Sequence, residues 1–273
     1  MMADNSDAGT LDAVCGRLAR ARRVLFITGA GISADSGLPT YRGIGGLYER
    51  GPTEDDVPIE VALSGEMFRE EPSLTWKYIF QIERACRGAR HNDAHRVISE
   101  MQSAFDVCVL TQNIDGFHRE AGSRRVIEMH GDIHELLCEG CGYARRVSDY
   151  AGLDSPPRCP HCGAIIRPRV VLFNEALPPQ AVIDWYDARR DGFDLVFSVG
   201  TTSVFPYIAA PVVEAAQADI PTVEINPGYT EVSALVAHRL RGRAAPCLRE
   251  LWERYRSSGG RAGEPSLGRQ RPQ

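Results

Sequence analysis

The chain has 273 residues, a formal net charge of −5 at pH 7, and a composition that is 43% hydrophobic and 25% charged, which is ordinary for a globular protein. Its length allows one large domain, or one domain with a smaller insertion. The acidic balance argues against DNA, RNA or an anionic membrane as a specific partner, and mildly favours basic partners such as lysine-rich protein segments.

Residues 1–10 are polar and acidic, and no apolar run in the chain approaches the roughly 20 residues of a membrane-spanning helix. This N-terminus lacks the apolar segment of a secretory signal and the arginines of a transit peptide. We therefore expect a cytoplasmic protein without a membrane partner.

Short apolar runs alternate with helical patterns along most of the chain. The runs lack strict alternation of apolar and polar residues, which predicts strands that are covered on both faces. These strand candidates are residues 24–28, 107–110, 195–199 and 222–225. The helix candidates are residues 11–20, 179–190 and 206–218. This order predicts an α/β fold with a Rossmann-like parallel sheet and helices on both of its faces.

Two stretches interrupt the alternation. Residues 51–105 are mostly helical with charged faces, and residues 132–169 are rich in Gly, Pro and Cys, so we expect them to be insertions that form a smaller lobe. The tail 257–273 has the composition of a disordered segment. The nucleotide-binding domain would then consist of residues 11–50, 106–131 and 170–256.

A glycine-rich turn follows the first predicted strand directly. Gly29, Ala30 and Gly31 could let the backbone approach a pyrophosphate. A Gly-x-Gly-x-x-Ala pattern alone is weak, because many tight turns carry such glycines. The acidic residue that a dehydrogenase carries about twenty positions later would fall among residues 45–49, which do not end a strand. The polar loop that follows instead suggests a lid over a nucleotide.

Two Cys-x-x-Cys pairs stand seventeen residues apart, Cys138 with Cys141 and Cys159 with Cys162. This spacing predicts two knuckles that hold one zinc ion through four thiolates, at Zn–S distances of about 2.3 Å. Because four sulfur ligands leave no open position, the metal should be structural. Disulfides or a redox dithiol pair are the alternatives, and a cytosolic setting disfavours both. The neighbouring His161 could replace one cysteine as a ligand.

Six motifs in a fixed order resemble those of the sirtuins, and they span roughly residues 24–250. The first is GAGISADSGLPTYRG at 29–43. Six ordered motifs are far more specific than any one of them, so the chain is identified as a bacterial-type sirtuin, a family of NAD-dependent protein deacylases. The other five motifs are TQNID at 111–115, VIEMHG at 126–131, VVLFNE at 170–175, VGTTS at 199–203 and VEIN at 223–226.

The resemblance implies that NAD is a consumed co-substrate. Asn113 and Asp115 would line its nicotinamide pocket, with Ile114 packed against the ring, and Asn226 would hydrogen-bond the adenosine ribose. Arg42 would face phosphate or ribose. By composition alone, Arg42 is a solvated charge in a loop, and residues 113–115 are a turn at the end of a strand. The implied NAD contacts are Gly29, Ala30, Gly31, Ser33, Asp35, Tyr41, Arg42, Gln112, Asn113, Ile114, Asp115, Gly200, Thr201, Ser203, Asn226 and Ala244.

The resemblance also implies a reaction. The amide oxygen of an acyl-lysine attacks the ribose carbon that carries nicotinamide, and nicotinamide leaves. His130 matches the catalytic histidine of the family and would take a proton from a ribose hydroxyl, which then attacks the resulting imidate. An ordinary pKa near 6.5 suits that role at neutral pH. The products would be nicotinamide, free lysine and O-acyl-ADP-ribose.

The expected partners are proteins or peptides that carry an acyl-lysine. Their backbone would add as a strand to the segment Val170, Val171, Leu172 and Phe173. Sirtuins that remove acidic acyl groups share a Tyr-x-x-Arg pair, and anchoring on Trp76 and residues 92–95 places Ile79 and Ile82 at those positions. A register shifted back by one gives Tyr78 and Gln81, which also lacks a cation. We therefore expect an apolar acyl pocket, although both isoleucines could simply be core residues.

Two residues depart from the usual family pattern. Tyr41 stands where phenylalanine is common, and Asn174 replaces a glycine, which reduces backbone freedom. Neither change removes a catalytic group, but either could slow turnover. Three other functions remain open: a mono-ADP-ribosyltransferase, a sensor that binds NAD or ADP-ribose without turnover, and a zinc-ribbon nucleic-acid binder. The retained His130 argues against the sensor, and the acidic balance against the nucleic-acid binder.

Overall fold

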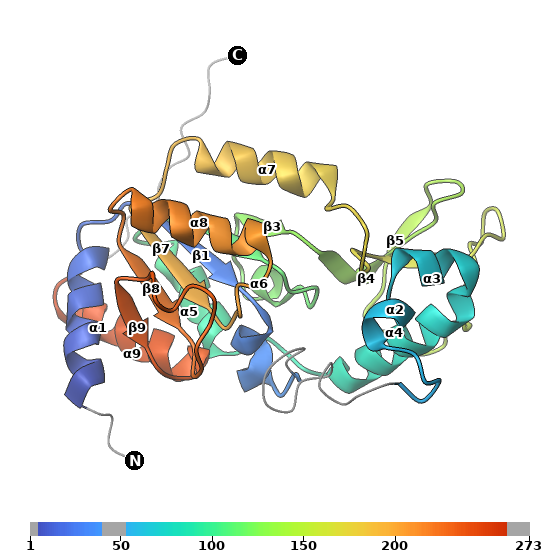
Figure 1. Cartoon of the computed structure of the whole chain (residues 1–273), viewed down its shortest axis with the longest axis horizontal. Coiled ribbons are helices and arrows are strands. Elements are labelled where there is room, and N and C mark those ends of the chain that lie inside the picture. The colour runs from blue at the N-terminus through green and yellow to red at the C-terminus, as the bar shows by residue number, and fades with distance from the viewer. Residues whose placement is uncertain (1–4, 40–52, 261–273) are drawn as a thin grey trace.

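The computed structural model describes residues 5–39 and 53–260, except for the side chains of residues 5–7. The described chain forms a large lobe around one sheet and a smaller lobe beside it (Figure 1). Among these residues, no helix is both long and apolar enough to cross a membrane.

A six-stranded parallel sheet forms the centre of the large lobe, in the order β3-β2-β1-β7-β8-β9. The expected strands are confirmed, and two short edge strands, β3 and β9, complete the sheet. The chain proceeds outward from β1 to β3 and then returns beside β1 as β7, so the direction of winding reverses between β1 and β7. The bounds are β1 Arg23–Thr28, β2 Asp106–Thr111, β3 Val126–Glu128, β7 Leu195–Val199, β8 Thr222–Ile225 and β9 His238–Leu240.

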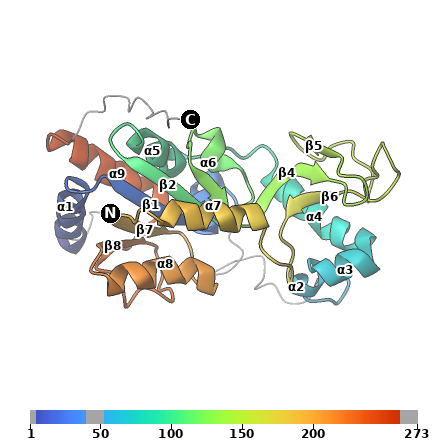
Figure 2. The same ribbon diagram turned by 90° about the horizontal axis from the view of Figure 1, so that it is seen from above.

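Helices cover both faces of this sheet, as expected from its apolar strands. Along β1, Val24 and Phe26 pack into one buried cluster with α1, α5 and α9, while Leu25 and Ile27 pack into another with α7 and α8. The two helical layers lie above and below the sheet in Figures 1 and 2. The bounds are α1 Asn5–Leu18, α5 Asp93–Met101, α7 Pro179–Arg189, α8 Pro206–Gln217 and α9 Ala244–Ser257.

The largest differences from the expected helices lie near the two ends of the described chain. Helix α1 begins six residues before the predicted start at residue 11, because its first turn carries no apolar periodicity. Helix α9 was not predicted as a helix, although Leu248, Leu251 and Trp252 bury one of its faces. It extends through Ser257, and the chain continues in turns to residue 260. The predicted start of the disordered tail, at residue 257, is therefore wrong. Residues 261–273 lie outside the described residues.

The smaller lobe combines three helices with a three-stranded antiparallel sheet in the order β5-β4-β6. Its apolar cluster joins both predicted interruptions, since Trp76 of α4 donates a hydrogen bond of 2.9 Å to the Ile166 carbonyl. Helix α5 belongs to the interruption 51–105 in sequence, yet it packs in the large lobe. The bounds are α2 Ile59–Ala62, α3 Gly65–Glu70, α4 Pro72–Cys86, β4 Gly131–Leu137, β5 Ala144–Arg146 and β6 Arg167–Val170.

Two buried histidines make the large lobe sensitive to acid. The Nε2 atom of His118 lies 2.9 Å from the Thr28 hydroxyl, and the His95 ring packs edge-on against His118 at 4.9 Å. Burial lowers the pKa of His95 to about 2, with a smaller contribution from His118, and burial also lowers the pKa of His118 to about 3. Both rings are therefore neutral in the folded protein, while in the unfolded chain they take up protons below about pH 6.5.

We predict that stability is retained above pH 6.5 and decreases as the pH falls below it. At pH 5 each buried histidine should account for about 2 kcal/mol of lost unfolding free energy. Urea unfolding at pH 7 and pH 5 should show that the neutral variant His118→Gln loses less stability than the wild type. The exposed residue His161 supplies the control, His161→Gln. A pH dependence that His118→Gln leaves unchanged would contradict this explanation.

Candidate active site

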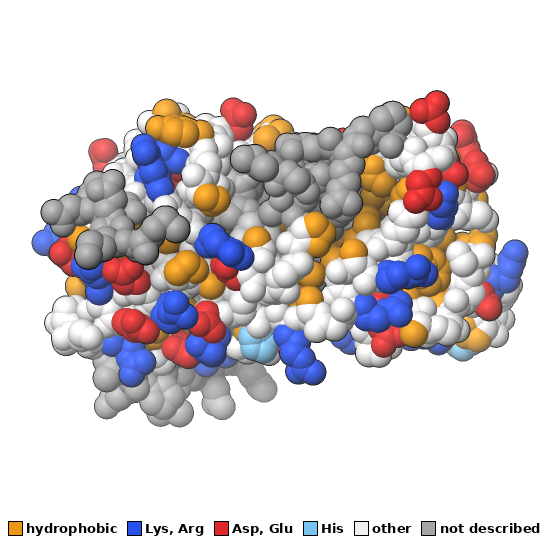
Figure 3. All heavy atoms as spheres, turned by 90° about the horizontal axis from the view of Figure 1, so that it is seen from below, with side chains coloured by type: hydrophobic (Ala, Val, Ile, Leu, Met, Phe, Trp, Pro, Cys, Tyr) orange, Lys and Arg blue, Asp and Glu red, His pale blue; other side chains and the backbone are white. Residues whose placement is uncertain are grey.

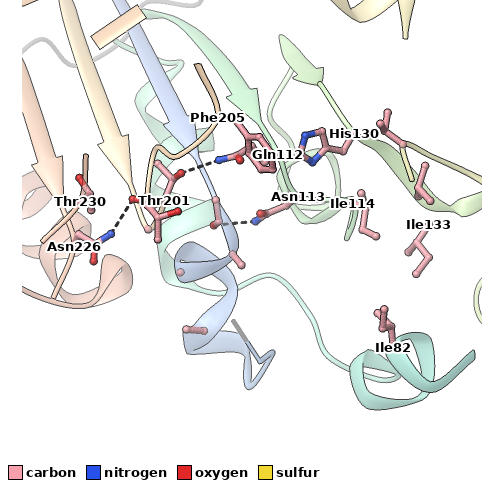
Figure 4. A pocket seen from close by; sticks show the side chains of 18 of the residues that line it. Ile82, Gln112, Asn113, Ile114, His130, Ile133, Thr201, Phe205, Asn226 and Thr230 are labelled. Atoms are coloured by element: carbon pink, nitrogen blue, oxygen red, sulfur yellow. Dashed lines mark hydrogen bonds between the residues drawn. The ribbon is translucent and has the colours of Figure 1, made fainter. Parts of the chain in front are cut away.

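A cavity of about 770 Å³ lies where β1 and β7 end. It extends from Asn226 and Ala244 in the large lobe, past His130, to Ile79 and Ile82 of α4 in the smaller lobe. Figure 4 shows side chains from both lobes pointing into this space. On the face of the molecule drawn in Figure 3, apolar side chains reach the surface beside the hollow between the lobes, and charges of both signs are mixed over the large lobe.

The floor of the cavity is bare backbone because two loops approach each other closely. The Gly31 N–H donates a hydrogen bond of 2.8 Å to the Gly200 carbonyl. A Cβ atom on Gly31 would lie 2.6 Å from the Gly200 Cα, and one on Gly29 would lie 2.8 Å from the Thr201 Cβ. The glycines after β1 are thus required by packing against the loop after β7, and this packing also leaves space above them for a ligand.

The two amide side chains at the end of β2 tie these loops together. Gln112 Nε2 donates to the Thr201 hydroxyl over 2.8 Å, and Asn113 Nδ2 donates to the Gly29 carbonyl over 3.1 Å. At the end of β8, Asn226 Nδ2 donates to the Thr201 carbonyl over 3.1 Å. These hydrogen bonds, drawn in Figure 4, fix the positions of the polar groups that border the cavity.

A second, smaller cavity of about 110 Å³ adjoins the first, and the residues that line both are Ala30, Ile82, Asn113, Ile114 and Ile133. Ser33 and Asp115 also line it, and the Ser33 hydroxyl donates to Asp115 Oδ2 over 2.7 Å. Asp115 Oδ1 accepts the Phe117 N–H over 3.0 Å. Burial raises the pKa of Asp115, and the Ser33 hydrogen bond opposes that rise. The arrangement presents a carboxyl group and an amide to a space about the size of one aromatic ring.

His130 stands between β3 and β4, where the two lobes meet. Its Nε2 atom lies 2.6 Å from the Tyr207 hydroxyl oxygen. Burial lowers its pKa to about 4, and a hydrogen bond to the Gln112 backbone opposes this effect, so the ring is neutral at physiological pH. The following residue must be glycine, because Gly131 has a φ of 80° and a Cβ atom there would overlap the Arg169 carbonyl oxygen.

The segment 170–173 borders the cavity but offers few free main-chain donors. The N–H of Val171 donates to the His130 carbonyl over 3.0 Å, and the N–H of Phe173 donates to the Leu63 carbonyl over 2.9 Å. The N–H of Leu172 donates to the Glu175 carboxylate over 2.9 Å. The carbonyls of Val170, Leu172 and Phe173 already accept hydrogen bonds. A peptide can therefore pair with this segment by adding to one of these carbonyls or by displacing an existing contact.

Asn174 adopts a left-handed conformation, with a φ of 63°. Glycine is the usual residue for such a backbone, and asparagine is among the few that tolerate it. Asn174 thus adopts a backbone conformation that glycine would favour. The next residue, Glu175, accepts two hydrogen bonds of 2.7 Å from the buried Arg167 guanidinium, which anchors the end of the segment to β6.

The four knuckle cysteines come together as the spacing predicts. All are free thiols whose Sγ atoms lie within 4.8 Å of one another, and the four sulfurs of a zinc site stand about 3.8 Å apart for Zn–S bonds of 2.3 Å. The two knuckles have the same hydrogen bonds: Cys138 N–H to Tyr143 and Gly142 N–H to Cys138, then Cys159 N–H to Ala164 and Gly163 N–H to Cys159. The residues fit one structural zinc ion, and neither disulfides nor His161 are needed.

The structure brings most of the expected site residues to the cavities. Ser33 and Asp115 line the smaller one, whereas Asp35 and Ser203 line neither. Asp35 Oδ1 instead pairs with Arg243 over 2.7 Å, and Ser203 is 2% exposed. Tyr41 and Arg42 lie outside the described residues. The expected residues that line the main cavity are Gly29, Ala30, Gly31, Ile79, Ile82, Gln112, Asn113, Ile114, His130, Val170, Val171, Leu172, Phe173, Gly200, Thr201, Asn226 and Ala244.

Sequence reasoning missed about half of the residues that line the main cavity, among them Ile133, Thr202, Phe205 and Tyr207. Thr202 takes the place at the cavity wall that was expected for Ser203. Phe205 and Tyr207 flank the proline that begins α8, and a helix start directly after a strand-end motif is the signal that could have found them.

The sheet with its reversal of winding, the glycine floor and the cysteine knuckles define an α/β nucleotide-binding protein with a metal-binding module. Comparison with known proteins then gives the family. A model described as the Sir2 family matches residues 29–206. The chain is 51% identical to the NAD-dependent protein deacylase 2 of Pseudomonas aeruginosa over 86% of this chain and 93% of that protein. The corresponding protein of Pseudomonas syringae is 49% identical over 86% and 96%.

Solved structures of Sir2 proteins are similar to this chain over most of its length. A Sir2 homologue in complex with NAD has a TM-score of 0.81 and 30% identity, over 90% of this chain and 94% of that one. Sir2Af2 bound to a myristoylated histone peptide has a TM-score of 0.74 and 26% identity, over 92% and 98%. The chain belongs to the Sir2 family, the sirtuins, and is of the bacterial type.

We predict that the metal supports folding and takes no part in the chemistry. The change Cys138→Ser should remove bound zinc and lower the melting temperature by roughly 5 °C or more, because binding free energy at such a site is partly folding free energy. Elemental analysis of the wild type should find about one zinc per chain. Cys15→Ser makes the same atomic exchange away from the cluster and should retain the metal. A zinc-free protein of unchanged stability would contradict the prediction.

Proposed function

We propose that this chain removes neutral acyl groups from lysine side chains of proteins and consumes NAD in doing so, giving nicotinamide and O-acyl-ADP-ribose. The observation that carries the proposal is the place of His130: a half-buried, neutral imidazole between the polar, glycine-floored end of the cavity and its apolar end. The curated names of the relatives and the NAD complex of a Sir2 homologue support it.

Each end of the cavity suits one of the two substrates. The glycine floor and Asn226 would receive the adenosine and pyrophosphate of NAD. The smaller cavity would receive nicotinamide, with Asp115 accepting the amide N–H groups and Ile114 against the ring. The apolar end would receive the acyl chain. This arrangement brings the acyl-lysine amide and the ribose carbon together beside His130.

The reaction follows from that placement. The amide oxygen bonds to the ribose carbon as the bond to nicotinamide breaks. The Nε2 atom of His130 then accepts a proton from a ribose hydroxyl, whose oxygen bonds to the former amide carbon. Water completes the release of the lysine amine, so the acyl group ends on ADP-ribose. A pKa of about 4 keeps the imidazole unprotonated at neutral pH, which a general base requires.

A mono-ADP-ribosyltransferase would use the same NAD site. A neutral base next to an apolar pocket favours acyl transfer, because ADP-ribosylation of an amino acid has no need of that pocket. We also propose a cytoplasmic setting, which supplies NAD and keeps the four knuckle thiols reduced.

We predict that His130→Ala lowers the rate of deacylation by about 10²–10⁴-fold. The fold and NAD binding should survive, because only the base is removed. Rates of acyl-peptide turnover, NAD titration and melting curves would be measured side by side. His91→Ala, which lies outside both cavities, is the control for loss of an imidazole. Near-normal deacylation by the His130 variant would refute the role proposed for this residue.

The acyl end of the cavity contains Ile79, Ile82, Ile114 and Ile133, and the last three form the wall that it shares with the smaller cavity. Among the described residues that line the whole cavity, the one cationic side chain is Arg243. It belongs to the large lobe, where it forms an ion pair with Asp35. A carboxylate on the acyl group would therefore be buried without a partner, which is costly. Sir2Af2, which binds a myristoylated peptide, shows that the fold can hold a long apolar chain.

We predict that acetyl-, butyryl- and longer-chain lysine peptides have kcat/KM values about tenfold or more above that of the succinyl version of the same peptide. The change Ile82→Arg should raise the succinyl activity relative to the acetyl activity, because arginine can clasp a carboxylate. The exposed Ile183 of α7 gives the control, Ile183→Arg. If succinyl-lysine is the best substrate of the wild type, the pocket is wrongly assigned.

A further inference from the structure

The first turn of α8 provides a side chain that contacts the proposed base. Pro206 begins the helix, and Tyr207 next to it lines the main cavity. Its hydroxyl oxygen lies 2.6 Å from His130 Nε2. This distance is at the short end of the range for hydrogen bonds that a hydroxyl group donates. No motif on which the family resemblance rests includes this residue.

The direction of that hydrogen bond follows from the other contact of the ring. The hydrogen bond to the Gln112 backbone raises the pKa of His130, so the backbone carbonyl accepts this hydrogen bond and a ring N–H donates it. With Tyr207 on Nε2, the nitrogen that donates to Gln112 is Nδ1. A neutral imidazole has one N–H, so Nε2 carries the lone pair and the phenol donates to it. The Gln112 backbone and the Tyr207 hydroxyl together favour the tautomer that a general base needs.

Aromatic packing holds the tyrosine in this position. The Phe205 and Tyr207 rings are stacked with centroids 5.6 Å apart and an interplanar angle of 19°. The edge of His130 meets Phe205 at 5.8 Å and 87°. The imidazole is therefore confined by two rings from the start of α8 and by the backbone at the end of β2.

We propose that Tyr207 is a positioning residue for His130: its hydroxyl holds Nε2 toward the cavity and occupies the lone pair until a ribose hydroxyl replaces it. The proposal rests on the proposed function. Because Nε2 has a single lone pair, the phenol O–H and the ribose O–H cannot both donate to it. Tyr207 thus keeps the base oriented in the free enzyme and yields its place in the step that needs the base.

The test separates the two stages of the reaction. Nicotinamide expulsion precedes the action of the base, so exchange of labelled nicotinamide into NAD should be insensitive to Tyr207, whereas formation of O-acyl-ADP-ribose should not be. For Tyr207→Phe, which keeps the ring stack, we expect product formation to fall about tenfold, with nicotinamide exchange and melting temperature within about twofold and 2 °C of the wild type. Tyr186→Phe, on the exposed face of α7, is the matched control.

A spectroscopic readout tests the contact independently of catalysis. In ¹⁵N spectra of histidine-labelled protein, the Nε2 resonance of His130, assigned by its loss in His130→Gln, should move in Tyr207→Phe and stay in Tyr186→Phe. The proposal is overturned if the resonance does not move, if product formation is unchanged or faster, or if exchange and product formation fall by the same factor. A wild type that makes no O-acyl-ADP-ribose would refute the proposed function instead, and would leave the contact to be judged by the spectra.

Discussion

The contact between the backbones of residues 29–31 and 200–201 is the constraint on which the site depends. The chain reverses its direction of winding between β1 and β7, so the loops after these two strands leave the sheet on either side of one crevice. They also touch, through the hydrogen bond from Gly31 to Gly200. A side chain at either position would push the strand ends apart and fill the floor of the cavity. Gln112, Asn113 and Asn226 are bonded to the same two loops, so the nucleotide end of the cavity is built as one unit.

The acyl end depends on a second close contact, at the junction of the lobes. The positive φ of Gly131 lets β4 pair with β6, and that pairing places the segment 170–173 against His130. The cysteine knuckles lie at the far ends of the same strands, where Cys138 directly follows β4. A structural metal at the knuckles would therefore hold the sheet that places His130 beside the apolar end of the cavity. Trp76 extends this support to α4 through its bond to Ile166.

Local patterns in the sequence were enough to predict the central strands, the two knuckles and about half of the residues that line the main cavity. These features are encoded in short stretches: a buried strand is a short apolar run, and a knuckle is a pair of cysteines with fixed spacing. Features that arise from meetings of distant segments were not predicted. Ser203 follows the correct strand but is turned into the interior, and Asp35 is engaged by Arg243 from a segment far along the chain. Tyr207 was missed because its partner is 77 residues away in sequence.

The central claim is that the acyl group moves from lysine to ADP-ribose with the loss of one nicotinamide. The most direct measurement is a product balance by mass spectrometry after incubation of the wild-type protein with NAD and one acetyl-lysine peptide. The account predicts equal amounts of nicotinamide, deacetylated peptide and O-acetyl-ADP-ribose, with the peptide left free of ADP-ribose. Free acetate released without consumption of NAD, or ADP-ribose attached to the peptide with its acetyl group intact, would contradict it.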